Sequence, residues 1–128
     1  MTPLQFRKIA LLAAALADEK KAEDILLLDL RKAVASVSDY ILIMSANSQT
    51  HMEALEWFLS DSLEEIGVNP VHKDGTRSEH WKVLDYGGLL VHIFHQEYRA
   101  FYSLERLWEE AKEIHWQKKN IKPKNKKR

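Results

Sequence analysis

The sequence predicts an α/β fold, in which a mixed β-sheet is flanked by helices on both faces. The hydrophobic pattern gives the order helix, two strands, helix, strands, helix, and the first two strands are apolar on both of their sides. Such strands are typical of the centre of a sheet that is covered by helices. A chain of 128 residues suits one domain of this kind.

The first predicted element is a helix. Thr2 can cap its start, and Pro3 suits the first helical position because a helix leaves that N–H unpaired in any case. The Ala-rich stretch carries the helix to about Asp18. Two short apolar runs follow, over residues 25–30 and 40–44, and we expect both to be buried strands.

A strongly amphipathic helix is predicted next. Ser48 or Thr50 can cap its start, and Gly67 stands where a left-handed residue would end it. Trp57 lies off the apolar stripe and is expected at the surface. The stripe has three- and four-residue spacing and consists of Met52, Leu55, Phe58, Leu59, Leu63 and Ile66.

The second half of the chain reads as strands, a hairpin and a last helix. Residues 71–73 form a short β-type run, and residues 81–94 form two longer ones that Gly87-Gly88 separates. Two glycines between β-type runs predict a tight turn, because glycine accepts the positive φ that such turns need. The last predicted helix places one apolar stripe on Phe101, Leu104, Trp108 and Ala111.

The net charge of zero hides an uneven distribution. Residues 118–128 hold seven of the 19 basic groups and no acidic group, so residues 1–117 carry a net charge of −7. A segment this poor in apolar side chains cannot offset its ordering entropy by burial. We therefore expect one domain over residues 1–116 and a disordered basic tail over residues 117–128. The acidic body should meet a basic protein surface, and the tail could contact phosphate.

The composition also bears on the compartment. The chain contains no cysteine, which excludes disulfides, zinc–thiolate sites and thiol catalysis. No apolar run approaches the roughly 18 to 20 residues that span a bilayer, and the start does not read as a secretory signal. We expect a cytoplasmic protein with no membrane association.

The candidate chemical motifs are weak. His92 and His95 could suggest a metal pair, but residues three apart on a strand face opposite sides and no third ligand follows at a recognisable spacing. Ser38, Ser45 and Ser48 lack the glycine elbow of a nucleophilic serine, so turns and helix caps explain them better. We therefore expect no metal, no cofactor and no catalytic residue.

Asp29 and Asp39 flank the first two strands, where carboxylates could hold magnesium for nucleotide transfer. An enzyme of that kind also needs a Gly-rich loop to hold phosphates, and the segment 45–48 contains no glycine. A nucleotidyltransferase-like enzyme remains an alternative that magnesium-dependent nucleotide binding would reveal.

An aromatic and acidic group at the hairpin is the most informative motif. Trp81 and Asp85 are four apart on a predicted strand and share a face, and Tyr86 leads into the turn. Trp and Tyr dominate the energetics of protein interfaces, so these residues could anchor a partner. Burial of the Trp under a helix is the other interpretation, and the spacing alone leaves both open.

Taken in order, these motifs resemble the ribosomal silencing factor (Iojap-like) family. The resemblance runs from about Lys21 to Trp108, and its specificity comes from the ordered set with matching gaps. The set consists of Asp29-Leu30, Ser38-Asp39-Tyr40, Ser45-Ala46-Asn47-Ser48 with His51, Trp81-Lys82-Val83-Leu84-Asp85-Tyr86-Gly87, Val91-His92-Ile93-Phe94, and Arg99-Ala100-Phe101-Tyr102-Ser103-Leu104-Glu105-Arg106-Leu107-Trp108.

The resemblance implies a fold distantly similar to nucleotidyltransferases but without their active site. It implies a non-enzymatic protein that binds the large ribosomal subunit through its fourteenth protein and sterically blocks joining with the small subunit, which represses translation. It also implies that members are often homodimers. The partner-binding residues that it suggests here are Trp81, Leu84, Asp85 and Tyr86.

Two positions depart from the family pattern. The family's turn usually reads Asp-Tyr-Gly-Asp, and Gly88 stands at its last position here, so one acidic contact is missing. Ala46 replaces the family's glycine after the second strand.

A third reading of the whole chain is a general RNA-binding module driven by the tail, which would lose its RNA affinity without residues 118–128. Within the main hypothesis, the tail would add a non-specific contact with ribosomal RNA.

Overall fold

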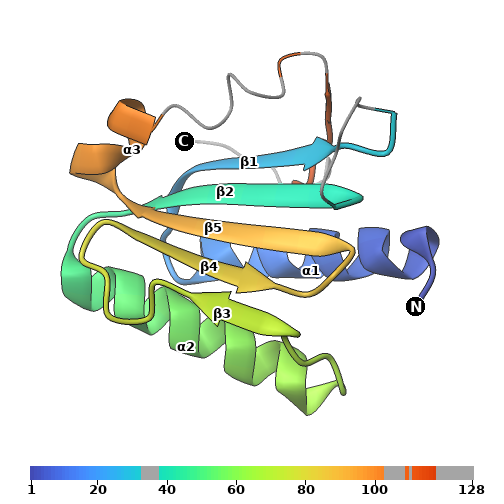
Figure 1. The fold of residues 1–128 in the computed structure, drawn as a ribbon, viewed down its shortest axis with the longest axis horizontal. Coiled ribbons are helices and arrows are strands. Elements are labelled where there is room, and N and C mark those ends of the chain that lie inside the picture. The colour runs from blue at the N-terminus through green and yellow to red at the C-terminus, as the bar shows by residue number, and fades with distance from the viewer. Residues whose placement is uncertain (33–37, 103–108, 110, 118–128) are drawn as a thin grey trace.

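The computed structural model of the protein describes residues 1–32, 38–102, 109 and 111–117. Within them lies a six-stranded sheet with the strand order β3-β4-β5-β2-β1-β6 (Figure 1). The elements in chain order are α1 (Pro3–Glu19), β1 (Glu23–Asp29), β2 (Tyr40–Ala46), α2 (Gln49–Glu65), β3 (His72–Asp74), β4 (Trp81–Asp85), β5 (Leu89–His95), α3 (Gln96–Tyr102) and β6 (Lys112–Glu113).

The sheet is mixed, as the sequence predicts. β2 and β5 pair in parallel at its centre, and the other neighbouring strands pair antiparallel. Every residue of β2 is buried, which matches its apolar sequence. The predicted α/β class, a mixed sheet flanked by helices, is therefore confirmed.

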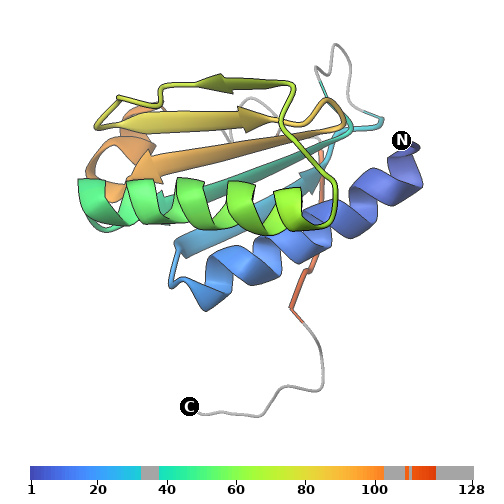
Figure 2. The ribbon, with the colours of Figure 1, turned by 90° about the horizontal axis from the view of Figure 1, so that it is seen from below.

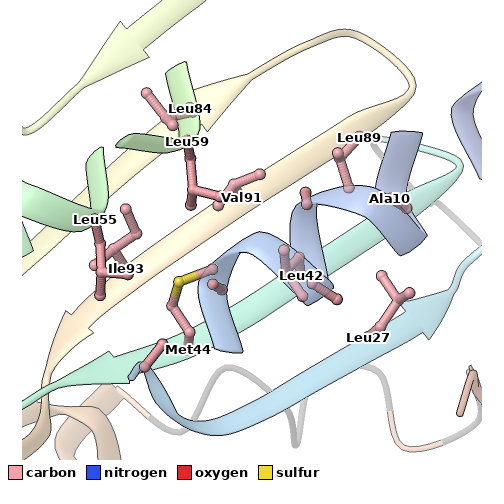
Figure 3. Packing of buried hydrophobic residues seen from close by; sticks show 14 of the residues in the cluster. Ala10, Leu27, Leu42, Met44, Leu55, Leu59, Leu84, Leu89, Val91 and Ile93 are labelled. Atoms are coloured by element: carbon pink, nitrogen blue, oxygen red, sulfur yellow. The ribbon is translucent and has the colours of Figure 1, made fainter. Parts of the chain in front are cut away.

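The two long helices, α1 and α2, lie side by side on one face of the sheet (Figure 2). Side chains of both helices and of the sheet form one apolar core between them (Figure 3). We call this side of the sheet the helix face, and its core includes Leu27, Leu42, Met44, Leu55, Leu59, Leu84, Val91 and Ile93.

The opposite side, which we call the outer face, carries a second and smaller apolar cluster. Its fully or nearly buried members are Leu28, Leu30, Ile41, Ile43 and Phe94, and Leu26, Trp81, Leu90 and Ala111 pack against them. None of the helices in the part described here is long and apolar enough to cross a membrane.

The caps of the first helix follow from its sequence. The Thr2 hydroxyl accepts a hydrogen bond from the Gln5 backbone N–H at 3.2 Å, and the Gln5 side chain accepts one from the Thr2 N–H at 2.7 Å. This reciprocal arrangement satisfies two backbone donors that the helix leaves unpaired. The predicted cap at Thr2 is confirmed.

The second helix begins at the first of its two predicted caps. The Ser48 hydroxyl accepts from the His51 N–H at 3.0 Å, and Thr50 lies inside the helix. Its end is a Schellman turn: Gly67 has φ +82°, its N–H donates to the Glu64 carbonyl, and the Val68 N–H donates to the Leu63 carbonyl. Trp57 is 67% exposed, as its place off the apolar stripe predicts.

Side-chain hydrogen bonds hold the ends of β1 and β2 in place. His51 accepts from the Asn47 N–H through Nδ1 at 3.0 Å, and its Nε2 lies 2.8 Å from the Lys20 carbonyl oxygen after α1. On the other side of the sheet end, Arg99 of α3 donates to the carbonyl of Asp24 and, at 3.0 Å, to the Ser45 hydroxyl. Asp24 lies in the bulge of β1 and has φ +48°.

The C-terminal part of the fold differs from the sequence prediction. Helix α3 is described from Gln96 to Tyr102, and the predicted stripe residues Leu104 and Trp108 lie outside the described residues, as does the basic tail from residue 118. Ala111 is not helical but lies in a bend just before β6, which pairs with the end of β1. This strand cannot be predicted from the sequence pattern, because two polar residues carry no strand pattern.

The predicted hairpin joins β4 and β5. The Tyr86 N–H donates to the Leu89 carbonyl at 2.8 Å, and Gly87 has φ +88°. Gly88 does not need a positive φ; it packs against the Phe6 ring of α1 instead, and a Cβ atom at Gly88 would lie 2.2 Å from Cδ2 of that ring. The glycine that replaces the family's usual acidic residue therefore makes room for Phe6.

We predict that Gly88→Ala lowers the free energy of unfolding by about 1 to 3 kcal/mol, because the added methyl overlaps the Phe6 ring. In a Phe6→Ala background the same substitution should cost clearly less. Urea denaturation of the two single variants and the double variant measures this coupling. Equal costs of Gly88→Ala with and without the Phe6 ring would contradict the packing argument.

Candidate partner-binding surface

The alternation of β4 divides its residues between the two sides of the sheet. Lys82 and Leu84 are buried on the helix face, whereas Trp81, Val83 and Asp85 point to the outer face and are half-buried. The prediction that Trp81 and Asp85 share a face is confirmed.

β5 completes this outer-face surface. In the antiparallel register, Trp81 lies opposite Phe94, Val83 opposite His92, and Asp85 opposite Leu90. Directly opposed side chains on one face of an antiparallel pair are in contact. We call the half-buried members, Trp81, Val83, Asp85 and Leu90, the β4–β5 surface.

Trp81 is held from two directions. Its indole Nε1–H donates to Nδ1 of His92 at 2.9 Å, and its ring stacks on Phe94 with centroids 5.1 Å apart and planes 20° from parallel. The sequence left open whether Trp81 is buried under a helix or lies at the surface. Trp81 packs within the protein and is half-buried, but it lies on the outer face and not under α1 or α2.

His92 lies beneath this surface and is only 7% exposed. Its neighbours across the sheet are Val83 on β4 and Ile43 on β2, both apolar. Burial in these surroundings disfavours the charged imidazolium and lowers the pKa of His92 to about 4. No group in the described part of the chain accepts a hydrogen bond from its Nε2.

Asp85 has a structural role beside any role in binding. Its Oδ1 accepts a hydrogen bond from the Gly87 N–H at 2.8 Å, which closes the turn from within. Within the described residues, no cation forms an ion pair with Asp85. One carboxylate therefore shapes the hairpin and also places a negative charge on the face of the sheet that carries Trp81.

The other two residues suggested by the resemblance lie inside the protein. Leu84 is 0% exposed in the helix-face core, next to Leu59 in Figure 3. Tyr86 is 4% exposed, and burial raises the pKa of its hydroxyl to about 12. Both side chains are buried in this structure and support the hairpin from behind, and contact of either with a partner stays a prediction. The position of Leu84 follows from strand alternation, since Leu84 is an odd number of residues from Trp81 and from Asp85.

Lys82 links the helix face of β4 to α2. Its side chain is 1% exposed, its Nζ lies 3.4 Å from Oε1 of Glu56, and it also donates to the backbone carbonyls of Gly75 and Thr76. A buried ammonium group is tolerated because this carboxylate and these carbonyls replace its water shell. The strand that carries Trp81 and Asp85 is thereby held in one position.

The other motifs have local structural partners. Asp29 accepts from the Arg31 guanidinium, which lowers the pKa of that carboxyl. Ser38 donates to the Gly87 carbonyl at 3.0 Å, and His95 accepts from the Glu97 N–H at 3.2 Å. Among the described residues, no group of three or more His, Asp or Glu side chains could hold a metal ion.

An α/β domain with a half-buried tryptophan and a carboxylate on the same face of a sheet has features that are common at protein interfaces. Comparison with known proteins identifies its family. The profile of the family described as "Ribosomal silencing factor during starvation" matches residues 3–128. The chain belongs to this family.

Individual relatives agree with this result. The ribosomal silencing factor RsfS of Bacillus subtilis is 37% identical over 105 residues, which cover 82% of this chain and 88% of the relative. That of Halalkalibacterium halodurans is 34% identical over 100 residues, which cover 78% and 85%. A crystal structure of a protein from Chromobacterium violaceum has a TM-score of 0.74 and 27% sequence identity, over 96% of this chain and 98% of the other.

The burial of His92 predicts a component of stability that depends on pH. The unfolded imidazole takes up a proton near pH 6.5, whereas folded His92 stays neutral until about pH 4. This component is therefore complete above pH 6.5 and is lost as the pH falls toward 4, with a loss of about 2 kcal/mol by pH 5.

Urea denaturation of the wild type and His92→Gln at pH 7.5 and pH 5 isolates this component, because the remaining histidines titrate in both proteins. The wild type should lose about 2 kcal/mol more than the variant between these two pH values. Equal losses would mean that His92 titrates in the folded protein as it does in the unfolded chain.

Proposed function

We propose that this protein binds the large ribosomal subunit through its fourteenth protein and sterically blocks joining with the small subunit, which represses translation. The observation that carries the proposal is the family match over residues 3–128. The relatives in Bacillus subtilis and Halalkalibacterium halodurans have the name ribosomal silencing factor. The compartment that goes with this function is the one that holds ribosomes, the cytoplasm.

The physical mechanism is competition for one surface. A bound factor occupies an area that a contact between the two subunits needs, so the two binding events exclude each other and are negatively coupled. No bond is made or broken. Inhibition should therefore depend on the concentration of the factor relative to its dissociation constant, and it should reverse when the factor dissociates.

The β4–β5 surface is the contact that we propose. Trp81, Val83 and Leu90 offer apolar area on a rigid sheet, and Asp85 adds a negative charge at its edge. A ribosomal protein presents many basic groups because it is built to bind RNA, and the net charge of −7 on residues 1–117 would attract such a surface over long range. Tail residues 118–128 would add salt-sensitive contacts with ribosomal RNA.

The direct test is sedimentation of cell extract through a density gradient at physiological salt. We expect the protein to migrate with free large subunits and to be absent from joined ribosomes. A protein that ends at residue 117 should still migrate with large subunits, because phosphate contacts of the tail contribute only non-specific affinity. The function is wrong if the full chain stays at the top of a gradient that contains free large subunits.

The resemblance also suggests a homodimer, and we include it in the proposal. Light scattering of the purified protein at several concentrations gives the mass in solution. Addition of purified large subunits then shows whether one or two copies bind each subunit.

The charge of Asp85 can be tested separately from its role in the turn. Asp85→Asn keeps an oxygen that accepts from the Gly87 N–H and removes only the charge, whereas Asp85→Lys removes the acceptor and reverses the charge. We expect Asp85→Asn to weaken binding to large subunits by roughly threefold to tenfold, and Asp85→Lys by about 30-fold or more.

Circular dichroism and a melting curve must accompany both variants, because loss of the turn would also abolish binding. Asp74→Asn shows the effect of a neighbouring charge, since Asp74 is an exposed acid on the edge strand β3 and pairs directly with Val83. Asp18→Asn is the control away from the surface, because Asp18 is an exposed acid of α1 on the other side of the sheet. If folded Asp85→Lys inhibits subunit joining at wild-type concentrations, the hairpin is not the contact.

A further inference from the structure

The side chains of Trp81 and His92 form one hydrogen-bonded unit on the outer face. They are neighbours across the β4–β5 ladder, although His92 lies directly opposite Val83 and Trp81 directly opposite Phe94. The indole Nε1–H reaches diagonally to Nδ1 of His92 at 2.9 Å, and the two rings are 5.7 Å apart between centroids. The contact joins residues 11 positions apart in the chain.

The donor fixes the state of the imidazole. An indole nitrogen can only donate, so Nδ1 of His92 must carry a lone pair, and the single proton of the neutral ring is on Nε2. That Nε2–H is buried and has no acceptor in the described part of the chain. A buried donor without an acceptor lowers the stability of the fold. A leucine of similar size would avoid this cost, but it would leave the Trp81 N–H without its acceptor.

We infer that His92 is the positioning residue of the β4–β5 surface: by accepting from the Trp81 indole through Nδ1, it holds that ring in the single orientation that meets the partner. The inference rests on the proposed function. The stacking of Trp81 on Phe94 limits the tilt of the ring, and the hydrogen bond to His92 selects which edge of the indole points inward. Together these two contacts leave the ring little rotational freedom to lose on binding.

The arrangement also specifies what the partner must offer. The Trp81 N–H already has an acceptor, so the partner group that meets this ring needs no hydrogen-bond acceptor. Asp85 lies four residues further along the same face and supplies a negative charge. Four residues of strand span about 13 Å, so the partner that fits offers an apolar group to the indole and a separate arginine or lysine to the Asp85 carboxylate.

The hydrogen bond can be observed directly through the indole N–H resonance of Trp81, assigned with a Trp81→Phe variant. His92→Leu removes the acceptor at similar size, whereas His92→Gln retains a side-chain acceptor. We expect His92→Leu to shift the Trp81 resonance upfield and His92→Gln to leave it close to its wild-type position. His95→Gln is the matched control, because it replaces another histidine of β5 that lies outside the surface.

Binding to purified large subunits then tests the role of this bond. His92→Leu should weaken binding about tenfold, and His92→Gln should restore affinity to within about threefold of the wild type. Trp81→Phe should lower affinity, and His92→Leu should have no further effect in that background, since the donor is gone. A purely structural role would instead lower the melting temperature in both backgrounds and give additive effects.

The outcomes distinguish failure of the proposed function from failure of the role inferred for His92. If wild-type protein does not bind large subunits, the proposed function fails, and the inference fails with it. If the wild type binds but His92→Leu binds equally well with a shifted Trp81 resonance, the proposed function stands and the inference is overturned. If His92→Leu does not fold, Trp81→Phe against Trp81→Phe with His92→Gln decides: equal binding supports the inference, and unequal binding refutes it.

Discussion

β2 and β5 run parallel at the centre of the sheet, with seven register pairs from Tyr40–Leu89 to Ala46–His95, and this pairing places every other element. β2 is buried along its whole length, so both of its sides must be covered. Parallel neighbours also need a long connection, and here it contains α2, β3 and β4. The hairpin at Gly87-Gly88 then returns the chain into β5, which fixes the side of the sheet to which each residue of β4 and β5 points.

The same alternation places the residues that stabilise the hairpin on one face and the residues of the proposed binding surface on the other face. Val91 and Ile93 pack toward the helices, while His92 and Phe94 face outward under Trp81. On β4, Leu84 and Lys82 are committed to the helix face, where Lys82 pairs with Glu56 of α2. A shift of one residue in the register would exchange these two sets, so that the buried lysine and the tryptophan would change sides. The buried half of the hairpin therefore determines what its other half presents.

Much of the fold could be predicted from the sequence because it is encoded locally. Short local sequences determine three backbone features: the cap at Thr2, the helix end at Gly67 and the Gly87-Gly88 turn. The structure contains all three. β6 could not be predicted, because its two polar residues pair with β1 only after the sheet exists. The placement of α1 and α2 on the same face also depends on contacts between distant segments.

The candidate surface was predictable in part for the same reason. Alternation correctly places Trp81 and Asp85 together, and it would also have placed Leu84 on the opposite side. Burial of Tyr86 against the helix-face core and the bond between Trp81 and His92 could not be inferred, since both depend on the register between strands. The resemblance to the family indicates which residues matter. It does not show whether a given residue contacts the partner or supports the residues that do.

In the proposed function, the β4–β5 surface would combine two physical effects that act at different stages of binding. Long-range attraction from the acidic body, and from Asp85 in particular, raises the rate of encounter with a basic partner and weakens as salt increases. The half-buried apolar groups, Trp81, Val83 and Leu90, act only on contact and lower the rate of dissociation. Because these groups are on a sheet fastened by Lys82 and His92, little side-chain entropy is lost on docking. In the proposed function, a factor of this kind would gain affinity from a small, rigid contact and would need no change in its fold to bind.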